Sequence, residues 1–293
     1  PMAGGHEGAG IIVKKGKSVR DELRIGDHVA LTHDYCGECN VCQQGRTSEC
    51  VEVPNPFTEK NKDGYYGQLG FATYSVRDAN TVMKMDKSLS FSEAGFLEPL
   101  ATVVSGLRRL RVKPMERVVV IGAGTMGVLN ALTAKAYGAD VYITELMDHK
   151  IELARSLGLH VIDIKEYDPV EKVKGLTNGD GADAVILAVG NTKANDQALG
   201  MVKEFNGRIL LFAAGYPAPQ INVDSNFIHY RKMELIGTYS ADINEFNQAA
   251  SLLNEGSVNV SKLIETKIPL EEIQKAYEIA SRDGSYRVSV LLQ

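Results

Sequence analysis

The chain has 293 residues, a net charge of −5 and 44% hydrophobic residues. This length corresponds to about two domains, and the composition is that of a folded globular protein. We expect no nucleic-acid partner and no membrane partner, because the chain is weakly acidic, has no basic run and has no apolar stretch long enough to cross a bilayer.

The chain begins with a glycine-rich segment in which His6 and Glu7 stand between Gly5 and Gly8. Such a segment is a loop rather than a helix interior, and an imidazole nitrogen beside a carboxylate oxygen suits a zinc ion. The alternative is a surface loop with a solvated histidine. Because so dense a motif starts at residue 4, we also expect a chain cut from a longer one.

All the cysteines of the chain lie in one window with the spacing C-x2-C-x2-C-x7-C: Cys36, Cys39, Cys42 and Cys50. Four thiolates in a tetrahedron form a closed structural zinc site, and Gly37 and Gly45 permit the backbone angles of such a knuckle. Two disulfides or four free thiols are the alternatives, which the clustering disfavours. We do not expect an oxidised, secreted framework, and we expect a cytoplasmic protein.

Glu98 stands at the start of a helix-like run that continues to Leu110, with Pro99 expected at the first helical position. A carboxylate in this place either caps the helix or has a function of its own. The residues alone leave both roles open.

A G-x-G-x-x-G turn follows the β-branched run 118–121 and consists of Gly122, Ala123, Gly124, Thr125, Met126 and Gly127. Gly122 permits a tight turn, Gly124 lets the backbone approach a pyrophosphate, and Gly127 lets the next helix pack closely. A helical pattern over 128–137 follows, and its amino terminus offers free N–H groups to phosphates. A strand before the turn and a helix after it are the context of a dinucleotide site.

Glu145 stands at the end of the next expected strand, 141–144, and is 18 residues beyond Gly127. A carboxylate there accepts hydrogen bonds from both ribose hydroxyls and repels a 2′-phosphate. No arginine follows closely, although Lys150 is five positions on, so the pattern favours NAD over NADP. The alternative is a solvated strand end.

The middle of the chain continues with four more apolar runs, separated by polar or helical segments such as 149–157 and 194–204: 160–162, 184–189, 208–212 and 233–236. Continuous apolar runs are typical of parallel strands covered by helices on both faces. Six strands with right-handed crossovers predict an α/β, doubly wound parallel sheet. Gly190 and Gly215 follow strands, at the edge where ligands bind in this architecture.

The GHE motif, the four-cysteine lobe and the glycine-rich turn, in this order, resemble the zinc-dependent medium-chain alcohol and polyol dehydrogenases. The similarity covers essentially the whole chain, including the tail 263–270 with Ala276 and Tyr277. It implies a GroES-like β-barrel catalytic domain over 1–100, a Rossmann domain over 101–238, and a return to the catalytic domain over 239–293. It also implies a homodimer or homotetramer formed through the cofactor domain.

The resemblance makes His6 a catalytic zinc ligand and places Glu7 beside or on the metal. Glu98 takes the position of a zinc ligand that is cysteine in ordinary alcohol dehydrogenases. The sorbitol dehydrogenase branch is similar to this chain, because it has a glutamate there, which holds the zinc through water. The four cysteines match the structural zinc lobe one for one. Four further positions match family contacts of the cofactor: Thr102, Val189, Ala214 and Thr238.

In the family, one more zinc ligand is a cysteine well upstream of GHE, closely followed by a Ser or Thr of the proton relay. The sequence has no residues there, so we expect a chain that lacks several tens of barrel residues. In the given sequence, the ligands available to a catalytic zinc ion are at most His6, Glu7, Glu98 and water.

The function implied is reversible hydride transfer between NAD and a secondary alcohol of a polyol or sugar alcohol, with zinc as Lewis acid. Threonine, butanediol and glucose dehydrogenases share similar motifs. Another alternative is a zinc-free quinone or enoyl reductase of the same superfamily, although those lack the cysteine lobe. The last alternative is a non-catalytic NAD-binding protein or an inactive fragment.

Overall fold

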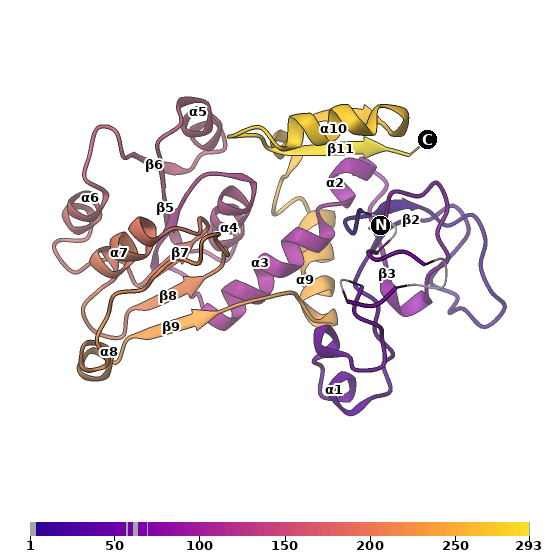
Figure 1. Cartoon of the computed structure of the whole chain (residues 1–293), viewed down its shortest axis with the longest axis horizontal. Helices are drawn as coiled ribbons and strands as arrows, with labels where there is room; N and C mark the ends of the chain where they lie inside the picture. The colour runs from indigo at the N-terminus through magenta and orange to yellow at the C-terminus, as the bar shows by residue number, and fades with distance from the viewer. Residues whose placement is uncertain (1–3, 57, 61–63, 69, 293) are drawn as a thin grey trace. The chain divides into compact units, whose positions relative to one another are not determined.

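The structure is a computed structural model that describes residues 4–56, 58–60, 64–68 and 70–292 (Figure 1). The chain forms two compact units. The first contains the chain up to Val104 and from Ser240 onward, and the second runs from Ser105 to Tyr239. Among the described residues, no helix combines the length and the apolar character that crossing a bilayer requires.

The second unit is built on a six-stranded parallel sheet with the strand order β6-β5-β4-β7-β8-β9. Its strands are β4 (Arg117–Ile121), β5 (Asp140–Glu145), β6 (His160–Asp163), β7 (Ala184–Leu187), β8 (Arg208–Leu211) and β9 (Glu234–Gly237). From β4, successive strands are added toward one edge of the sheet as far as β6, and from β7 onward toward the other edge. The boundary between β4 and β7 is the switch point of a doubly wound fold. This confirms the predicted parallel α/β sheet and its six strands.

Helices connect these strands: α4 (Thr125–Ala136), α5 (Asp148–Ser156), α6 (Pro169–Leu176), α7 (Thr192–Met201) and α8 (Ser225–Arg231). The strand interiors are mainly apolar because helices cover the sheet, and all four residues of β7 are buried. Val119, Val185 and Ile209 of neighbouring strands share one core with Met201 of α7. Element ends differ from the sequence patterns by one to three residues, as for α4, which begins within the glycine motif.

The first unit contains a small antiparallel sheet with the order β1-β2-β3, formed by β1 (Ala9–Ile11), β2 (His28–Leu31) and β3 (Val82–Lys84). Between β2 and β3 lie the helix α1 (Asn40–Gln43) and the 3-10 turns η1 (Thr47–Glu49) and η2 (Ala79–Thr81). The helix α2 (Phe91–Ala94) follows, closed by a capping box between Ser90 and Glu93. Strands this short leave much of the unit to loops, which depend on side-chain contacts for their positions.

The end of the chain returns to the first unit as α9 (Ile243–Asn254), η3 (Ser261–Leu263), β10 (Ile264–Pro269), η4 (Leu270–Glu272), α10 (Ile273–Ala280) and β11 (Arg287–Leu291). β10 and β11 pair in parallel. The Asn254 side chain accepts a 2.8 Å hydrogen bond from the Asp86 N–H and donates one of 3.3 Å to the Lys84 carbonyl. These bonds join α9 to the end of β3.

The helix α3 (Leu97–Leu110) places Glu98 in its first turn. The prediction that Pro99 holds the first helical position is wrong, because the helix begins two residues earlier, at Leu97. Leu97 and Leu100 are completely buried, and their burial anchors this first turn. Glu98 is itself only 7% exposed, which is unusual for a carboxylate.

Candidate metal centres and cofactor site

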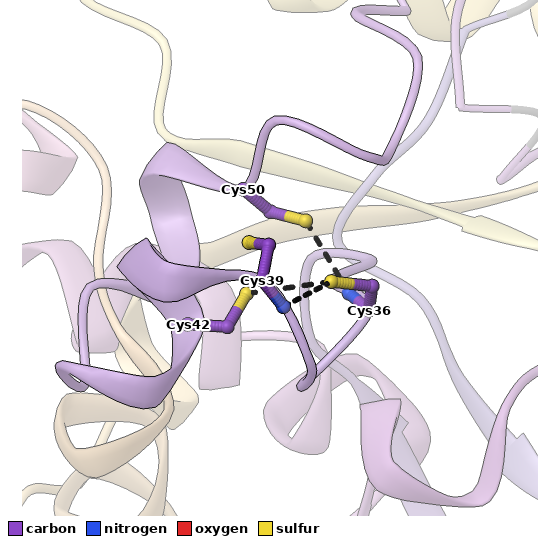
Figure 2. Close-up of side chains that lie close together, drawn as sticks. All are labelled: Cys36, Cys39, Cys42 and Cys50. Atoms are coloured by element: carbon purple, nitrogen blue, oxygen red, sulfur yellow. Dashed lines mark hydrogen bonds between the residues drawn. The ribbon is translucent and has the colours of Figure 1, made fainter.

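The four cysteines converge in a single loop region of the first unit (Figure 2). Cys39 precedes α1, Cys42 lies within it, and Cys50 follows η1. All four sulfur atoms lie within 4.8 Å of one another, and the Sγ atoms of Cys36 and Cys42 are 3.9 Å apart. A tetrahedron with Zn–S bonds of about 2.3 Å requires sulfur atoms about 3.8 Å apart. The donor set and its spacing therefore fit a structural zinc ion.

Backbone N–H groups point at the sulfurs, as thiolate ligands require. Cys36 Sγ accepts from the N–H groups of Glu38 at 3.4 Å and Cys39 at 3.3 Å, and Cys50 Sγ accepts from the Cys36 N–H at 3.3 Å. Gly37 and Gly45 have positive φ values of 75° and 81°, which a knuckle of this kind needs. None of the four thiols is in a disulfide.

The thiols of this cluster differ in their pKa values. Hydrogen bonding from the Cys42 backbone lowers the pKa of Cys39 to about 6, whereas burial raises the pKa of Cys42 to about 12. The pKa of Cys50 is lowered by the N–H groups of Cys36 and Glu52 against the opposing effect of burial. Zinc binds thiolates, so a metal ion here would displace the remaining protons.

The lobe also caps a helix of the same unit. Asp242 precedes α9, and its Oδ1 accepts hydrogen bonds of 2.8 Å from both the N–H and the hydroxyl of Ser48. The Ile243 N–H, in the first turn of α9, donates to the Thr47 hydroxyl at 2.9 Å. The cysteine lobe and the start of α9 thus satisfy each other's polar groups.

A second cluster brings His6 and Glu7 together with Glu98, with one donor atom of each within 4.8 Å of the others. His6 Nε2 lies 3.7 Å from Glu98 Oε2. The segment with GHE is held by backbone pairing, since the Gly70 N–H donates to the Gly5 carbonyl at 2.9 Å. The cluster offers one imidazole nitrogen and two carboxylates, which are donor types of a catalytic zinc site. The His6 side chain is half-exposed, whereas Glu98 is buried.

Two residues that the sequence patterns did not indicate also touch this cluster. His33 Nε2 lies 3.1 Å from Glu98 Oε1, and Arg287 Nη2 donates to Glu7 Oε1 at 2.6 Å. His33 stands three residues before the first cysteine, and Arg287 begins the last strand. Neither belongs to a local motif, so only the folded chain reveals them.

The charge balance of the cluster is visible at Glu7. Burial raises the pKa of its carboxyl group above the usual range, the positive charge of Arg287 acts against this, and the negative charge of Glu98 raises the pKa further. A cation beside these two neighbouring carboxylates would favour the ionised form of Glu7.

In the second unit, the three glycines of the turn have different surroundings. Gly122 has a φ of +98°, and a Cβ added to Gly127 would lie 1.8 Å from the Gly122 carbonyl oxygen. A Cβ added to Gly124 would meet nothing within 4 Å. Gly124 is the N-cap of α4, whose first two residues are Thr125 and Met126. The open space above a helix amino terminus fits the pyrophosphate of a dinucleotide.

Glu145 is 8% exposed, so it is not a solvated strand end. One carboxylate oxygen accepts from the Ala123 N–H at 2.8 Å, and the other accepts from the N–H groups of Leu146 at 2.7 Å and Met147 at 3.0 Å. The carboxylate therefore joins the glycine-rich turn to the end of β5.

The other expected cofactor contacts follow neighbouring strands. Val189 follows β7 and packs on the turn, since a Cβ on Gly122 would lie 2.5 Å from its Cγ1. Ala214 follows β8, and its carbonyl oxygen would lie 2.2 Å from a Cβ on Gly190. Thr238 follows β9 with a buried hydroxyl. Thr102 belongs to the first unit, where its hydroxyl donates to the Pro99 carbonyl at 2.8 Å.

Comparison with known protein families decides the affiliation. Residues 1–87 match the alcohol dehydrogenase GroES-like domain, and residues 125–255 match the zinc-binding dehydrogenase family. Sorbitol dehydrogenase of Bacillus subtilis (strain 168) is 30% identical over 284 residues, which are 96% of this chain and 77% of that protein. The chain belongs to the zinc-dependent alcohol dehydrogenase family.

Other members of the family are about equally similar. L-threonine 3-dehydrogenase of Pyrococcus abyssi (strain GE5 / Orsay) is 30% identical over 100% of this chain and 82% of that protein. A solved zinc-binding dehydrogenase of Sinorhizobium meliloti 1021, bound to NADP, superposes with a TM-score of 0.84 at 25% identity, covering 99% of this chain and 84% of that one. The predicted family, Rossmann and GroES-like fold class and zinc-dependent alcohol or polyol oxidoreductase function are confirmed.

Proposed function

We propose that the chain catalyses reversible hydride transfer between NAD and a secondary alcohol of a polyol or sugar alcohol. The observation that carries the proposal is the convergence of His6, Glu7 and Glu98 on one point, from segments that are far apart in sequence. These three residues would hold the catalytic zinc, and the four-cysteine lobe would hold a structural zinc. When bound, zinc acts as a Lewis acid on the alcohol oxygen and NAD accepts the hydride.

The chain's own residues supply binding and orientation. His6 offers a neutral nitrogen and Glu98 a buried oxygen, while the ion pair with Arg287 fixes the direction of the Glu7 carboxylate. In the cofactor unit, the amino terminus of α4 receives the pyrophosphate beside Gly124. The remaining cofactor contacts are Thr102, Gly122, Thr125, Met126, Gly127, Glu145, Val189, Ala214 and Thr238.

NAD is the cofactor we propose, rather than the NADP found in the Sinorhizobium meliloti relative. The supporting feature is the buried carboxylate of Glu145 at the end of β5, which would repel a 2′-phosphate. Titration with NADH and NADPH, followed by nucleotide fluorescence, should give the lower dissociation constant for NADH. Equal affinity for both nucleotides would contradict this assignment.

A polyol is the proposed substrate class because a donor set of one nitrogen and two oxygens leaves the metal site polar. L-threonine is the second candidate, supported by the similarity to the Pyrococcus abyssi enzyme. Turnover on a panel of polyols, L-threonine, butanediol and glucose would separate these possibilities. A binding protein without activity would show affinity for NAD but no turnover on any of them.

The domain arrangement and assembly are part of the same proposal. Residues 1–100 and 239–293 form the catalytic part and residues 101–238 the cofactor part, which would join copies into a homodimer or homotetramer. Light scattering after size exclusion tests the assembly. We also propose a cytoplasmic location, since a reducing compartment keeps clustered cysteines available for zinc.

The central test measures zinc per chain and turnover on protein of verified intact mass. The intact protein should hold two zinc ions, and His6→Ala should hold one, lose turnover and keep its affinity for NAD. If His6→Ala retains both zinc ions and normal turnover, the site is assigned wrongly.

A further inference from the structure

The carboxylate of Glu98 lies between two imidazoles. His6 Nε2 is 3.7 Å from Oε2, and His33 Nε2 is 3.1 Å from Oε1. Because Glu98 is only 7% exposed, water can do little to stabilise its charge or fix its orientation. The shorter of the two contacts is made by His33, which the proposed function leaves without a role.

The His33 ring is itself firmly held. It packs edge-on against Phe246 of α9, with centroids 5.4 Å apart and an interplanar angle of 86°, and Phe246 is 1% exposed. On either side of His33, Thr32 N–H donates to the Thr81 carbonyl at 3.0 Å, and Asp34 pairs with Arg77 at 3.2 Å. These contacts hold the imidazole beside Glu98.

The four-cysteine lobe constrains both supports of His33. Along the chain, Cys36 follows His33 by three residues, so the lobe fixes the end of this short segment. Through space, the lobe caps α9, the helix that carries Phe246, by the Asp242–Ser48 and Ile243–Thr47 hydrogen bonds. The lobe is therefore connected to His33 both along the chain and through α9.

We propose that His33 is a positioning residue: its Nε2, 3.1 Å from Glu98 Oε1, holds that oxygen and leaves Oε2 directed at the metal side of the cluster, and the four-cysteine lobe acts through His33 on metal affinity there. This inference rests on the proposed function, since it takes Glu98 as a group at the catalytic metal. Partners that orient a metal-binding carboxylate typically change metal affinity by about 10- to 100-fold. The lobe is thus more than a local staple, because it sets the geometry of the other site.

The test is a Co²⁺ titration of the full chain whose lobe is already filled with zinc, read from the absorption spectrum of the second site. His33→Leu should weaken Co²⁺ binding by about 10- to 100-fold and alter the spectrum. His33→Gln, whose amide N–H reaches to a similar place, should recover most of the affinity. His28→Leu and His28→Gln are the matched controls, because His28 belongs to the same unit but packs against Phe91. Both should bind Co²⁺ as the unaltered protein does.

Equal affinity in His33→Leu and the unaltered protein would overturn the inference, and so would equal losses in His33→Leu and His33→Gln, because the N–H would then be irrelevant. The proposed function fails separately if Glu98→Ala leaves Co²⁺ binding at the second site unchanged. If the unaltered protein binds no second metal, both ideas fall.

The coupling to the lobe needs a double-mutant cycle on the same titration. Cys50→Ser should weaken the second site, and adding His33→Leu should weaken it little further, because both changes remove one interaction. Phe246→Leu, combined with His33→Leu in the same way, serves if Cys50→Ser does not fold. Additive losses in these cycles would show that the lobe does not act through His33.

Discussion

The two units of the chain build their sites in opposite ways. In the second unit, the turn from Gly122 to Gly127 and Glu145 belong to one continuous strand–helix–strand stretch, and the hydrogen bond from the Ala123 N–H to Glu145 joins its ends. In the first unit, the Glu7–Arg287 and His33–Glu98 pairs join segments far apart in sequence. A local site is fixed when its strands form, whereas a long-range site depends on the closure of the whole unit. Variants should therefore have confined effects in the second unit and wide effects in the first.

The largest effect should come from Cys42→Ser in the first unit. Cys42 is 8% exposed and is one of four ligand positions. Structural zinc contributes about 10–16 kcal/mol to the folding of isolated zinc-finger peptides, and much of such a contribution is lost with one ligand. Elemental analysis should show one zinc fewer per chain, and limited proteolysis should cut near residues 36–50. Unchanged zinc content would mean that the lobe is not a metal site.

Cys42→Ser should leave the second unit intact. This expectation tests directly whether the effects of a variant in the first unit stay within that unit. The affinity for NADH should stay within about twofold of the unaltered protein, since the glycine-rich turn and Glu145 both belong to the second unit. A large loss of NADH affinity would show that the two units are not independent.

The glycine turn offers the next largest effect, at Gly127. A Cβ there would lie 1.8 Å from the Gly122 carbonyl oxygen, a backbone atom that cannot move without opening the turn. Gly127→Ala should lower the free energy of unfolding of the second unit by about 3 kcal/mol, at the upper end of the usual cost of overpacking. Urea unfolding followed by circular dichroism measures this.

Gly124→Ala is its matched control, because the added Cβ meets nothing within 4 Å and the backbone is extended, with φ −69° and ψ −179°. Stability should change by less than about 0.5 kcal/mol. The dissociation constant of NADH should nevertheless rise about tenfold or more, because the methyl group takes the space of the pyrophosphate. If both glycine variants lose stability alike, Gly124 has a structural role instead.

A smaller effect is expected for Glu145→Gln. The side-chain oxygen can still accept some of the three N–H bonds, so unfolding should become easier by only about 1 kcal/mol. The ratio of NADPH to NADH affinity should rise about tenfold, because the repelling charge is gone. Nucleotide titration decides the point, and an unchanged ratio would remove Glu145 from the specificity determinants.

The smallest effect concerns Asp183, just before β7. Burial would raise the pKa of its carboxyl group, but the hydrogen bonds from Lys203 Nζ at 2.6 Å and the Arg117 N–H at 2.9 Å outweigh it and lower the pKa. Its contribution to stability is therefore present above the ordinary aspartate pKa and is lost as the pH falls through that value and below it.

Asp183→Asn should cost about 1 kcal/mol at neutral pH, a value reduced by the side chain's partial exposure. In strong acid, the difference from the unaltered protein should vanish. Asp180→Asn, at an exposed position nearby, is the control and should show no such pH dependence. A penalty that persists in acid would mean that charge is not its source.

The sequence predicts the second unit well because its signals are local. Continuous apolar runs such as 184–189 correspond to buried strands, and the glycine spacing marks the turn between β4 and α4. The start of α3 was misplaced, since Pro99 tolerates any position in the first helical turn, where its missing N–H has no partner.

The first unit is predicted only in part. The cysteine spacing indicates the lobe, because all its ligands lie within one short segment. The sequence does not predict His33 and Arg287 as site residues, because a histidine before a loop and an arginine in a terminal strand are common in folded proteins. Their partners, Glu98 and Glu7, lie 65 and 280 positions away in sequence. Pairing at such separations is set by the closed fold rather than by any local spacing.

The caps that Thr47 and Ser48 provide for α9 have a consequence for how such a chain can change over generations. A descendant that lost the four cysteines and the fold of their loop would not merely lose an ion, because the Ile243 amide would lose its Thr47 partner and Asp242 its two bonds to Ser48. Loss of the metal and repair of the helix end must then be inherited together. Drift at the cysteines is thereby restrained by two residues that bind no metal at all.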